Sequence, residues 1–178
     1  MRIMDIFLRG MNVSMADRLN PVLQNQEFRF QFRFTPKQQS IQTLERIDLD
    51  NPDSKGRESV EIVEYQVEAA ARFLDPQLVL DDSSAIDPSA VLVEIIATFS
   101  ATYARNDCTD EAIKVFGIHN VPLHVWPFWR ELLQNTLSRM KMPSVTLGMY
   151  VPSKGVHALA ILDDPDSLKV TSDAQPKS

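Results

Sequence analysis

The side chains best suited to catalysis or metal binding are few and widely spaced in this sequence. The histidines are His119, His124 and His157, and the first two lie on either side of Pro122. Their spacing does not suit one helical face, and no nearby carboxylate clearly completes a ligand set, so the sequence predicts no metal site. Cys108 could act as a nucleophile beside a histidine, but a lone cysteine after a strand is more often a small packed residue.

Glu94 is the one carboxylate inside a strongly apolar segment, residues 91–99. Alternation with Val93 and Ile95 predicts that Glu94 points to solvent, and the functional alternatives are a charged contact for a partner or a general base. The sequence contains no GxGxxG, GxxxxGK(S/T), GxSxG or HExxH motif. We therefore expect no catalytic residue, no cofactor and no enzymatic activity.

The overall composition is that of a globular protein. The chain has 178 residues, 44% of them hydrophobic, with 18 Lys and Arg against 24 Asp and Glu and a net charge of −6. This acidic balance argues against binding to nucleic acid, which requires a basic face. Because there is one cysteine, no secretory leader and no span long enough for a bilayer, we expect a cytoplasmic protein without membrane insertion. We expect one domain over residues 1–160 and a polar tail over 161–178.

Four strands are predicted in the first part of the chain. Residues 27–35 alternate aromatic and polar side chains with a period of two, which is typical of a strand. The other strands are expected over residues 11–15, 58–73 and 91–103, with a β-bulge between Val63 and Tyr65. The remaining segments are expected to be connections: residues 37–57 an extended hairpin connection that could contain a half-turn of helix or a short strand, and residues 74–90 an acidic loop.

The periodicity changes after Thr109, where acidic residues indicate a helix start. This first helix is expected to be brief because Gly117 and Pro122 follow it. A long helix is expected to begin at Pro127, a residue favoured in the first turn, and to stop before Pro143. Its apolar stripe consists of Trp129, Leu132, Leu133, Thr136, Leu137 and Met140.

A short extended piece over residues 145–150 and a small helix over 155–162 are expected to follow. The predicted fold class is therefore α+β, a four-stranded antiparallel sheet packed with one long C-terminal helix. The helix can cover only one face of such a sheet. Because an isolated protomer would expose apolar surface, we expect it to associate with other chains.

The segment from Leu123 to Leu147 resembles the signature region of the SecB export chaperones. That region has a Pro-aromatic pair, an Arg-Glu helix start, a Ser-Arg pair near the helix end and a proline before a short extended stretch. The matching residues here are Pro127, Phe128, Arg130, Glu131, Ser138, Arg139, Pro143 and Leu147. The order of the strands is also similar, so the resemblance covers about residues 2–150. The chain departs from the pattern at Met140, where the family usually has glycine, and at Gly10 and Ser14, where it has acidic residues.

The resemblance implies a SecB-like fold and an ATP-independent holdase, a homotetramer built as a dimer of dimers. Such a protein keeps unfolded polypeptides or preproteins from folding in the cytoplasm, for export through SecA or for a dedicated client such as an antitoxin. In the family a Leu and a Glu two residues apart on the last strand contact SecA, and Leu92 and Glu94 occupy those positions. Client-binding residues are expected mainly in an apolar loop before the long helix, although the same side chains could instead fill the core. They are Phe116, Ile118, Val121, Leu123, Val125, Trp126, Met140 and Met142.

Two alternatives belong to other classes of protein. One is a small enzyme with a hot-dog-like helix and sheet, for which Glu131 or His124 would be the best catalytic candidates. The other is a structural subunit whose apolar surface is used up by self-association.

Overall fold

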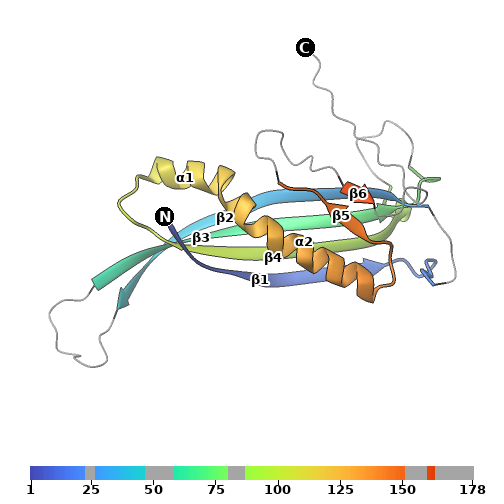
Figure 1. The fold of residues 1–178 in the computed structure, drawn as a ribbon, viewed down its shortest axis with the longest axis horizontal. Helices are drawn as coiled ribbons and strands as arrows, with labels where there is room; N and C mark the ends of the chain where they lie inside the picture. Colours follow the sequence, from blue (N-terminus) through green and yellow to red (C-terminus); the bar gives the residue numbers. More distant parts are fainter. Residues whose placement is uncertain (23–26, 47–57, 80–86, 151–159, 163–178) are drawn as a thin grey trace, which may run out of the picture.

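One antiparallel sheet forms the centre of the molecule. The structure, a computed structural model, describes residues 1–22, 27–46, 58–79, 87–150 and 160–162. The sheet contains β1 (Arg2–Met15), β2 (Arg29–Arg46), β3 (Glu58–Leu74) and β4 (Val91–Ala104), in the order β1-β4-β3-β2 (Figure 1). A single turn of 3₁₀ helix (Pro88–Ala90) precedes β4.

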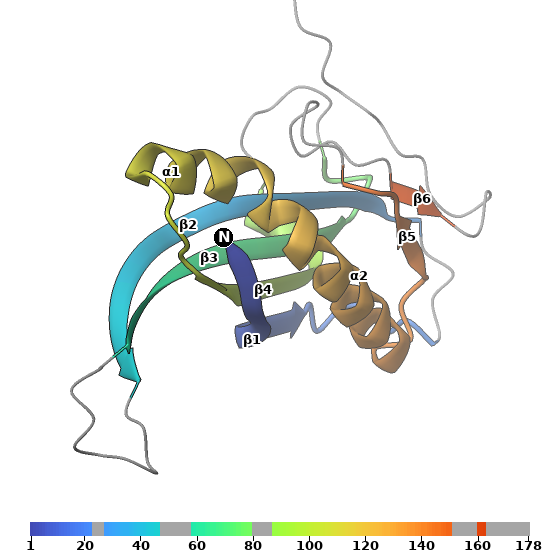
Figure 2. The ribbon, with the colours of Figure 1, turned by 60° about the vertical axis from the view of Figure 1, so that its left-hand side comes forward.

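Two helices, α1 (Asp110–His119) and α2 (Val121–Arg139), lie on one face of this sheet (Figure 2). A short antiparallel pair, β5 (Val145–Leu147) and β6 (Ala160–Leu162), completes the described fold. The predicted α+β class, with a four-stranded antiparallel sheet and a long C-terminal helix, is confirmed.

Alternation along the strands divides the sheet into two faces. On the helix-covered face, β3 and β4 place side chains such as Val67 and Ile95, both almost completely buried. Phe34 lies on the same face and packs against Trp126 of α2, with ring centroids 5.5 Å apart. The residues between these positions, including Glu94, point to the opposite face, which we name the open face. The predicted orientation of Glu94 is therefore confirmed.

The two helices form one bent unit because Pro122 lies at their junction. Asn120 joins α1 to α2 in helical conformation, but Pro122 has no N–H to donate to the preceding turn. Pro127 lies inside α2, so the prediction that the helix begins there is wrong. The helix tolerates Pro127 because its ring faces solvent, where water can satisfy the carbonyl group that loses its partner.

The end of α2 is a Schellman motif with a lysine at the position that usually requires glycine. The Met142 N–H donates to the Leu137 carbonyl group at 3.0 Å, and the Lys141 N–H donates to the Ser138 carbonyl group at 3.2 Å. Lys141 has a φ of 58°, in the left-handed region. This turn reverses the chain and brings Val145 and Leu147 into the core.

Several predicted boundaries are wrong for physical reasons. β1 begins at Arg2, and β2 continues to Arg46 although residues 37–46 were expected to lie in a connection. Pro36 does not end β2 because an edge strand can accept a proline, and the register shifts there by a bulge between Pro36 and Gln38. The bulge expected between Val63 and Tyr65 is absent from the described pairing of β3.

The C-terminal predictions are only partly covered by the structure. Residues 160–162 form a strand rather than the end of a small helix, because they pair with β5. The rest of that predicted helix, residues 155–159, and the tail from residue 163 onward lie outside the described residues. The division into a domain and a tail stays a prediction.

Candidate functional site

The predicted client-binding region lies over a buried aromatic cluster at the junction of α1 and α2. The Tyr65 hydroxyl group donates to the Ile113 carbonyl group at 2.7 Å, which ties β3 to α1. The rings of Tyr103 and Phe116 meet edge to face, with centroids 5.0 Å apart. Gly117 allows this close approach, because a Cβ atom there would lie 2.5 Å from Cε1 of Tyr65. The glycine that was expected to limit the first helix instead lets the helix pack on the sheet.

His124 belongs to the same cluster and makes a structural contact. Its Nδ1 lies 2.9 Å from the hydroxyl oxygen of Tyr103, a fully buried residue. Burial raises the pKa of Tyr103 well above its usual range, and the neighbouring Tyr65 raises it further. A hydroxyl group with this pKa is not an acid at neutral pH. Glu131 is exposed on α2, and no hydrogen bond or ion pair joins it to His124 in the described part of the chain.

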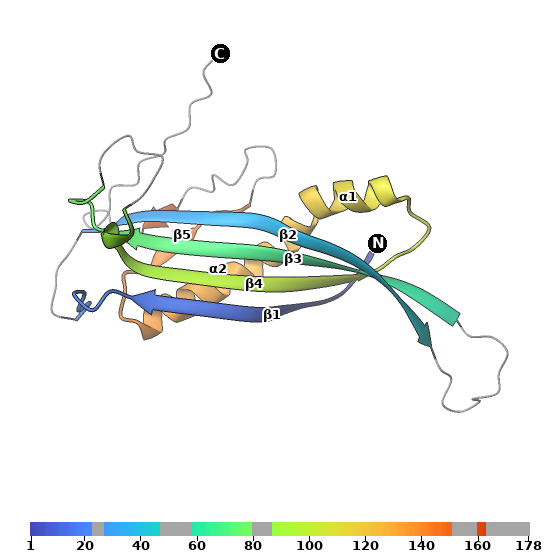
Figure 3. The same ribbon diagram turned by 180° about the vertical axis from the view of Figure 1, so that it is seen from behind.

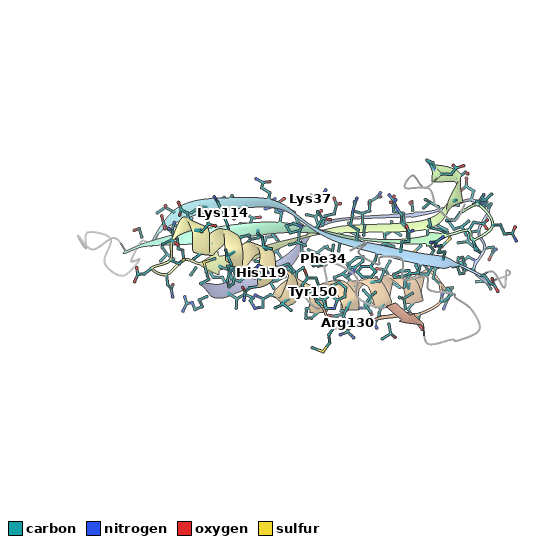
Figure 4. All side chains as sticks on the ribbon, turned by 90° about the horizontal axis from the view of Figure 1, so that it is seen from above. Phe34, Lys37, Lys114, His119, Arg130 and Tyr150 are labelled. Carbon is teal, nitrogen blue, oxygen red and sulfur yellow. The ribbon has the colours of Figure 1, made fainter. Side chains whose placement is uncertain are left out.

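A second aromatic cluster fixes the chain after α2. The indole N–H of Trp126 donates to the Gly148 carbonyl group at 2.8 Å. The Trp126 ring lies between Phe32, Phe34 and Tyr150, with centroid distances of 5.5–5.9 Å among these contacts. Figure 4 shows Phe34 and Tyr150 together on the side of β2 that faces the helices. Trp126 therefore acts as an anchor in the core.

The predicted client-binding residues separate into three groups by exposure. Four of them, Val121, Val125, Trp126 and Met142, are buried. Phe116 and Met140 are partly buried and pack against the core. Ile118 and Leu123 remain exposed, at 59% and 40%. The interpretation of this region as an apolar loop is wrong, because the segment is helical and its buried side chains recur with helical periodicity.

Two further apolar side chains lie on the solvent side of the helices and were not found by sequence reasoning. They are Val115 of α1 and Phe128 of α2, and both are more than two-fifths exposed. We name Val115, Ile118, Leu123 and Phe128 the outer helix residues. In the sequence, Phe128 was considered only as part of the family motif. Its neighbour Trp129 belongs to the predicted apolar stripe, and adjacent residues on a helix point in different directions. This was the signal that could have indicated the exposure of Phe128.

The first strand provides another exposed apolar surface. β1 is an edge strand that pairs only with β4 within the described residues. Six of its apolar side chains, on both faces, are 37–50% exposed: Ile3, Met4, Phe7, Leu8, Met11 and Val13. The expected strand over residues 11–15 missed most of them, because bulges at Ile3/Asp5 and Leu8/Gly10 interrupt the alternation along β1.

The two predicted SecA-contact residues are both engaged within the chain. Leu92 is 1% exposed, so its side chain has almost no surface for a partner. Glu94 lies on the open face and accepts a hydrogen bond from Nε of Arg72 at 2.6 Å. This carboxylate is therefore already neutralised by a neighbouring guanidinium group.

The described residues contain neither a cluster suited to a metal ion nor a membrane-spanning helix. Among these residues, no three His, Cys, Asp or Glu side chains gather as a metal ion would require. None of the described helices has the length and apolar character needed to cross a membrane.

Comparisons with known proteins support the architecture. No protein-family model and no curated protein match the sequence. Among solved structures, the chain is similar to the Mycobacterium tuberculosis Rv1957 SecB-like chaperone in complex with a ChAD peptide from the Rv1956 HigA1 antitoxin. The match has a TM-score of 0.55 and 14% sequence identity, and it covers 84% of this chain and 90% of that one. This structural similarity confirms the SecB-like fold predicted from the sequence.

Proposed function

We propose that this protein is an ATP-independent chaperone that holds unfolded polypeptides. The observation that carries the proposal is a fold shared with a SecB-like chaperone, combined with exposed apolar side chains on both the outer helix residues and β1. A monomeric soluble protein rarely exposes many large apolar side chains without an interaction that uses them. An unfolded client supplies apolar side chains of its own, so the association requires no chemical step.

The outer helix residues are the surface that we assign to client binding. Ile118 and Leu123 are the two predicted residues that remain well exposed, and Val115 and Phe128 are further exposed apolar side chains on the same two helices. Phe116 and Met140 are partly buried, so each keeps some accessible side-chain surface. The four buried residues belong to the core, so we do not assign them to client contact.

We assign the β1 edge to self-association. A long edge strand with apolar side chains is a template for pairing with another strand, and soluble proteins normally protect such edges. The opposite edge, β2, is protected by Pro36 and Lys37. Pairing of two copies through β1 would extend the sheet and cover Phe7 and Leu8. A homotetramer built from two such dimers is the assembly that we propose.

A dedicated client is better supported than export through SecA. The structural neighbour was solved with a peptide from an antitoxin, which is consistent with a chaperone for one partner. Leu92 is buried and Glu94 is paired with Arg72, so neither resembles an open contact for SecA. The proposed location is the cytoplasm, where the single Cys108 would remain reduced.

An aggregation assay tests the holdase function. A reduced, unfolded client is diluted into buffer with a stoichiometric amount of the chaperone, and light scattering is followed over time. We expect the wild-type protein to suppress aggregation and the double variant Ile118→Gln, Leu123→Gln to suppress it much less. A control is Ile41→Gln, which changes an isoleucine that is 42% exposed on the protected edge. Failure of the wild-type protein to slow aggregation would contradict the proposal.

Light scattering of the purified protein tests the assembly. We expect a mass of several protomers for the wild type and a lower mass for Met11→Lys, Val13→Lys, because charges on β1 oppose edge pairing. The control pair Ile41→Lys, Leu44→Lys places the same charges on β2 and should leave the mass unchanged. A monomeric wild type at micromolar concentration would refute the assigned edge.

A further inference from the structure

The ion pairs on the open face share one orientation, with the basic side chain outermost. Arg9 is paired with Glu64 at 2.7 Å, Arg33 with Glu68 at 2.7 Å, and Arg72 with Glu94 at 2.6 Å. The basic side chains are 40–59% exposed, whereas their carboxylate partners are only 16–22% exposed. A molecule that approaches this face, which lies toward the viewer in Figure 3, therefore meets guanidinium groups first.

The pairing also leaves an excess of positive charge near the middle of β2. Lys37 lies 3.2 Å from the same Glu68 oxygen that Arg33 contacts, so one carboxylate serves two cations. Glu64 is further occupied by the Ser100 hydroxyl group, which donates to it at 2.6 Å. The face is thus cationic at its surface although the whole chain carries a net charge of −6.

A small hollow lies between two of the exposed guanidinium groups. It has a volume of about 160 Å³ and is lined by Gln31, Phe32, Arg33, Ala70 and Arg72. Ala70 lies at the base of the hollow, because its short side chain is paired with Arg33 in the register of β2 and β3. The hollow has room for a short side chain, and guanidinium groups match the planar geometry of a carboxylate.

We propose that the open face is a docking surface for an acidic polypeptide segment, whose carboxylates bind the outer guanidinium groups of Arg33 and Arg72. A segment rich in Asp or Glu complements the outward cations and avoids the inner carboxylates. We favour a peptide carboxylate over a phosphate polymer because the hollow between Arg33 and Arg72 has room for a short side chain. This surface is separate from the outer helix residues, because the helices cover the other face of the sheet.

The proposal extends the chaperone function with a second partner and does not depend on it. A protein that holds a client on its helices could bind an acidic partner through the sheet at the same time. The preference for an acidic segment follows from the outer position of the basic member of each ion pair.

Fluorescence anisotropy with a labelled glutamate-rich peptide tests the proposal on the full chain. We expect the wild type to bind and the double variant Arg33→Gln, Arg72→Gln to bind about tenfold more weakly, as expected for the loss of charge-assisted contacts. Lys114→Gln is the matched control, because Lys114 is an exposed cation on α1 (Figure 4) and should leave the affinity unchanged. Circular dichroism verifies that each variant is folded.

A charge-swapped variant distinguishes the effect of ion-pair orientation on peptide binding from the effect of net charge. The variant Arg72→Glu, Glu94→Arg keeps the composition but places a carboxylate at the outer position, so we expect it to weaken peptide binding as well. Wild-type affinity in the swapped variant or in the double variant would overturn the proposal, as would a wild type that does not bind the peptide. Binding of a single-stranded oligonucleotide or of phosphatidylserine vesicles that is stronger than peptide binding and depends on Arg33 and Arg72 would also overturn it. None of these outcomes bears on the aggregation assay.

Discussion

The helix-covered face and the open face of the sheet are built by the same strands but are stabilised by different forces. On the helix-covered face of β4, Val93, Ile95 and Ala97 are completely buried beneath the helices. On the open face of the same strand, Glu94 and Thr98 remain partly exposed, and Glu94 is held by an ion pair. Burial of a large apolar side chain contributes about 1.5–3 kcal/mol, whereas a partly exposed ion pair contributes about 1 kcal/mol or less.

Stability and surface chemistry are therefore assigned to opposite faces of the sheet. The helix-covered face provides most of the free energy of folding, so its residues have little freedom to vary. The open face contributes little and can carry a charge pattern suited to a partner. Substitutions on the two faces should therefore have very different effects on unfolding.

The largest effect is expected at Trp129, the largest fully buried side chain. The substitution Trp129→Ala should lower the free energy of unfolding by about 3–5 kcal/mol, because it leaves a cavity between α2 and the sheet. Urea unfolding followed by circular dichroism measures this change. Phe128→Ala is the control, since the neighbouring aromatic side chain is exposed and its removal should cost much less. Equal costs at the two positions would contradict the assigned faces.

The next largest effect on the free energy of unfolding is expected at Gly117, and Gly10 on the open face provides the comparison. Gly117→Ala places a Cβ atom 2.5 Å from the Tyr65 ring, so α1 must move away from the sheet. We expect a loss of about 1–3 kcal/mol in the free energy of unfolding, typical of overpacking. Gly10→Ala is the control, because no atom lies within 4 Å of the added Cβ. It should be neutral or slightly stabilising, and a large loss there would show that the open face is packed.

The stability contributions of the two faces should be lost at opposite ends of the pH range. Burial raises the pKa of Tyr65 to about 12, against 10.0 for an unburied tyrosine, so the folded state retains a proton that the unfolded state loses. Stability from this group is complete below pH 10.0 and is lost as the pH rises toward about 12. The Ser100 hydrogen bond, with help from Arg9, lowers the pKa of Glu64 below 4.5, so its contribution is present above pH 4.5 and is lost on acidification.

Urea midpoints across the pH range measure both responses. Tyr65→Phe should reduce the loss of stability at alkaline pH and leave the acid response unchanged. Ser100→Ala should reduce the loss of stability at acidic pH and leave the alkaline response unchanged, because it weakens the interaction that holds Glu64 ionised. A change in the alkaline response of Ser100→Ala would mean that the two faces are coupled.

The smallest effect is expected for the ion pair between Arg72 and Glu94. A double-mutant cycle with Arg72→Gln and Glu94→Gln should give a coupling energy below about 1 kcal/mol, because both side chains are partly exposed. Urea unfolding in low and high salt measures it, and salt should weaken it further. A coupling energy as large as the cost of Trp129→Ala would assign the open face a structural role.

Local pattern was sufficient to predict most elements of the fold. Alternation identified the strands that became β2, β3 and β4, and helical periodicity identified the buried stripe of α2 at Trp129, Leu133 and Leu137. Boundaries were predicted less well. The predicted strand over residues 27–35 ends just before Pro36, and the predicted helix begins at Pro127. Both prolines lie inside longer elements, because an edge strand and a solvent-facing helix turn can each lose one N–H group.

The candidate sites were less predictable than the elements. The apolar residues before Pro127 were recognised, but Val125 and Ile118 are equally apolar in the sequence, and only one of them is buried. Which side of a helix faces the sheet depends on the packing partner, and the bend at Pro122 sets that orientation for α1 and α2 separately.

The fold class, the orientation of Glu94 and the apolar stripe of the long helix were predictable without coordinates, since they follow from the periods of strands and helices. That β1 is an edge strand of the described sheet and that Gly117 admits the Tyr65 ring became clear only from the packing of the folded chain. The same packing showed that the open-face carboxylates Glu64, Glu68 and Glu94 lie beneath their basic partners. These features depend on distances between residues far apart in the chain, and local periodicity contains no information about those distances.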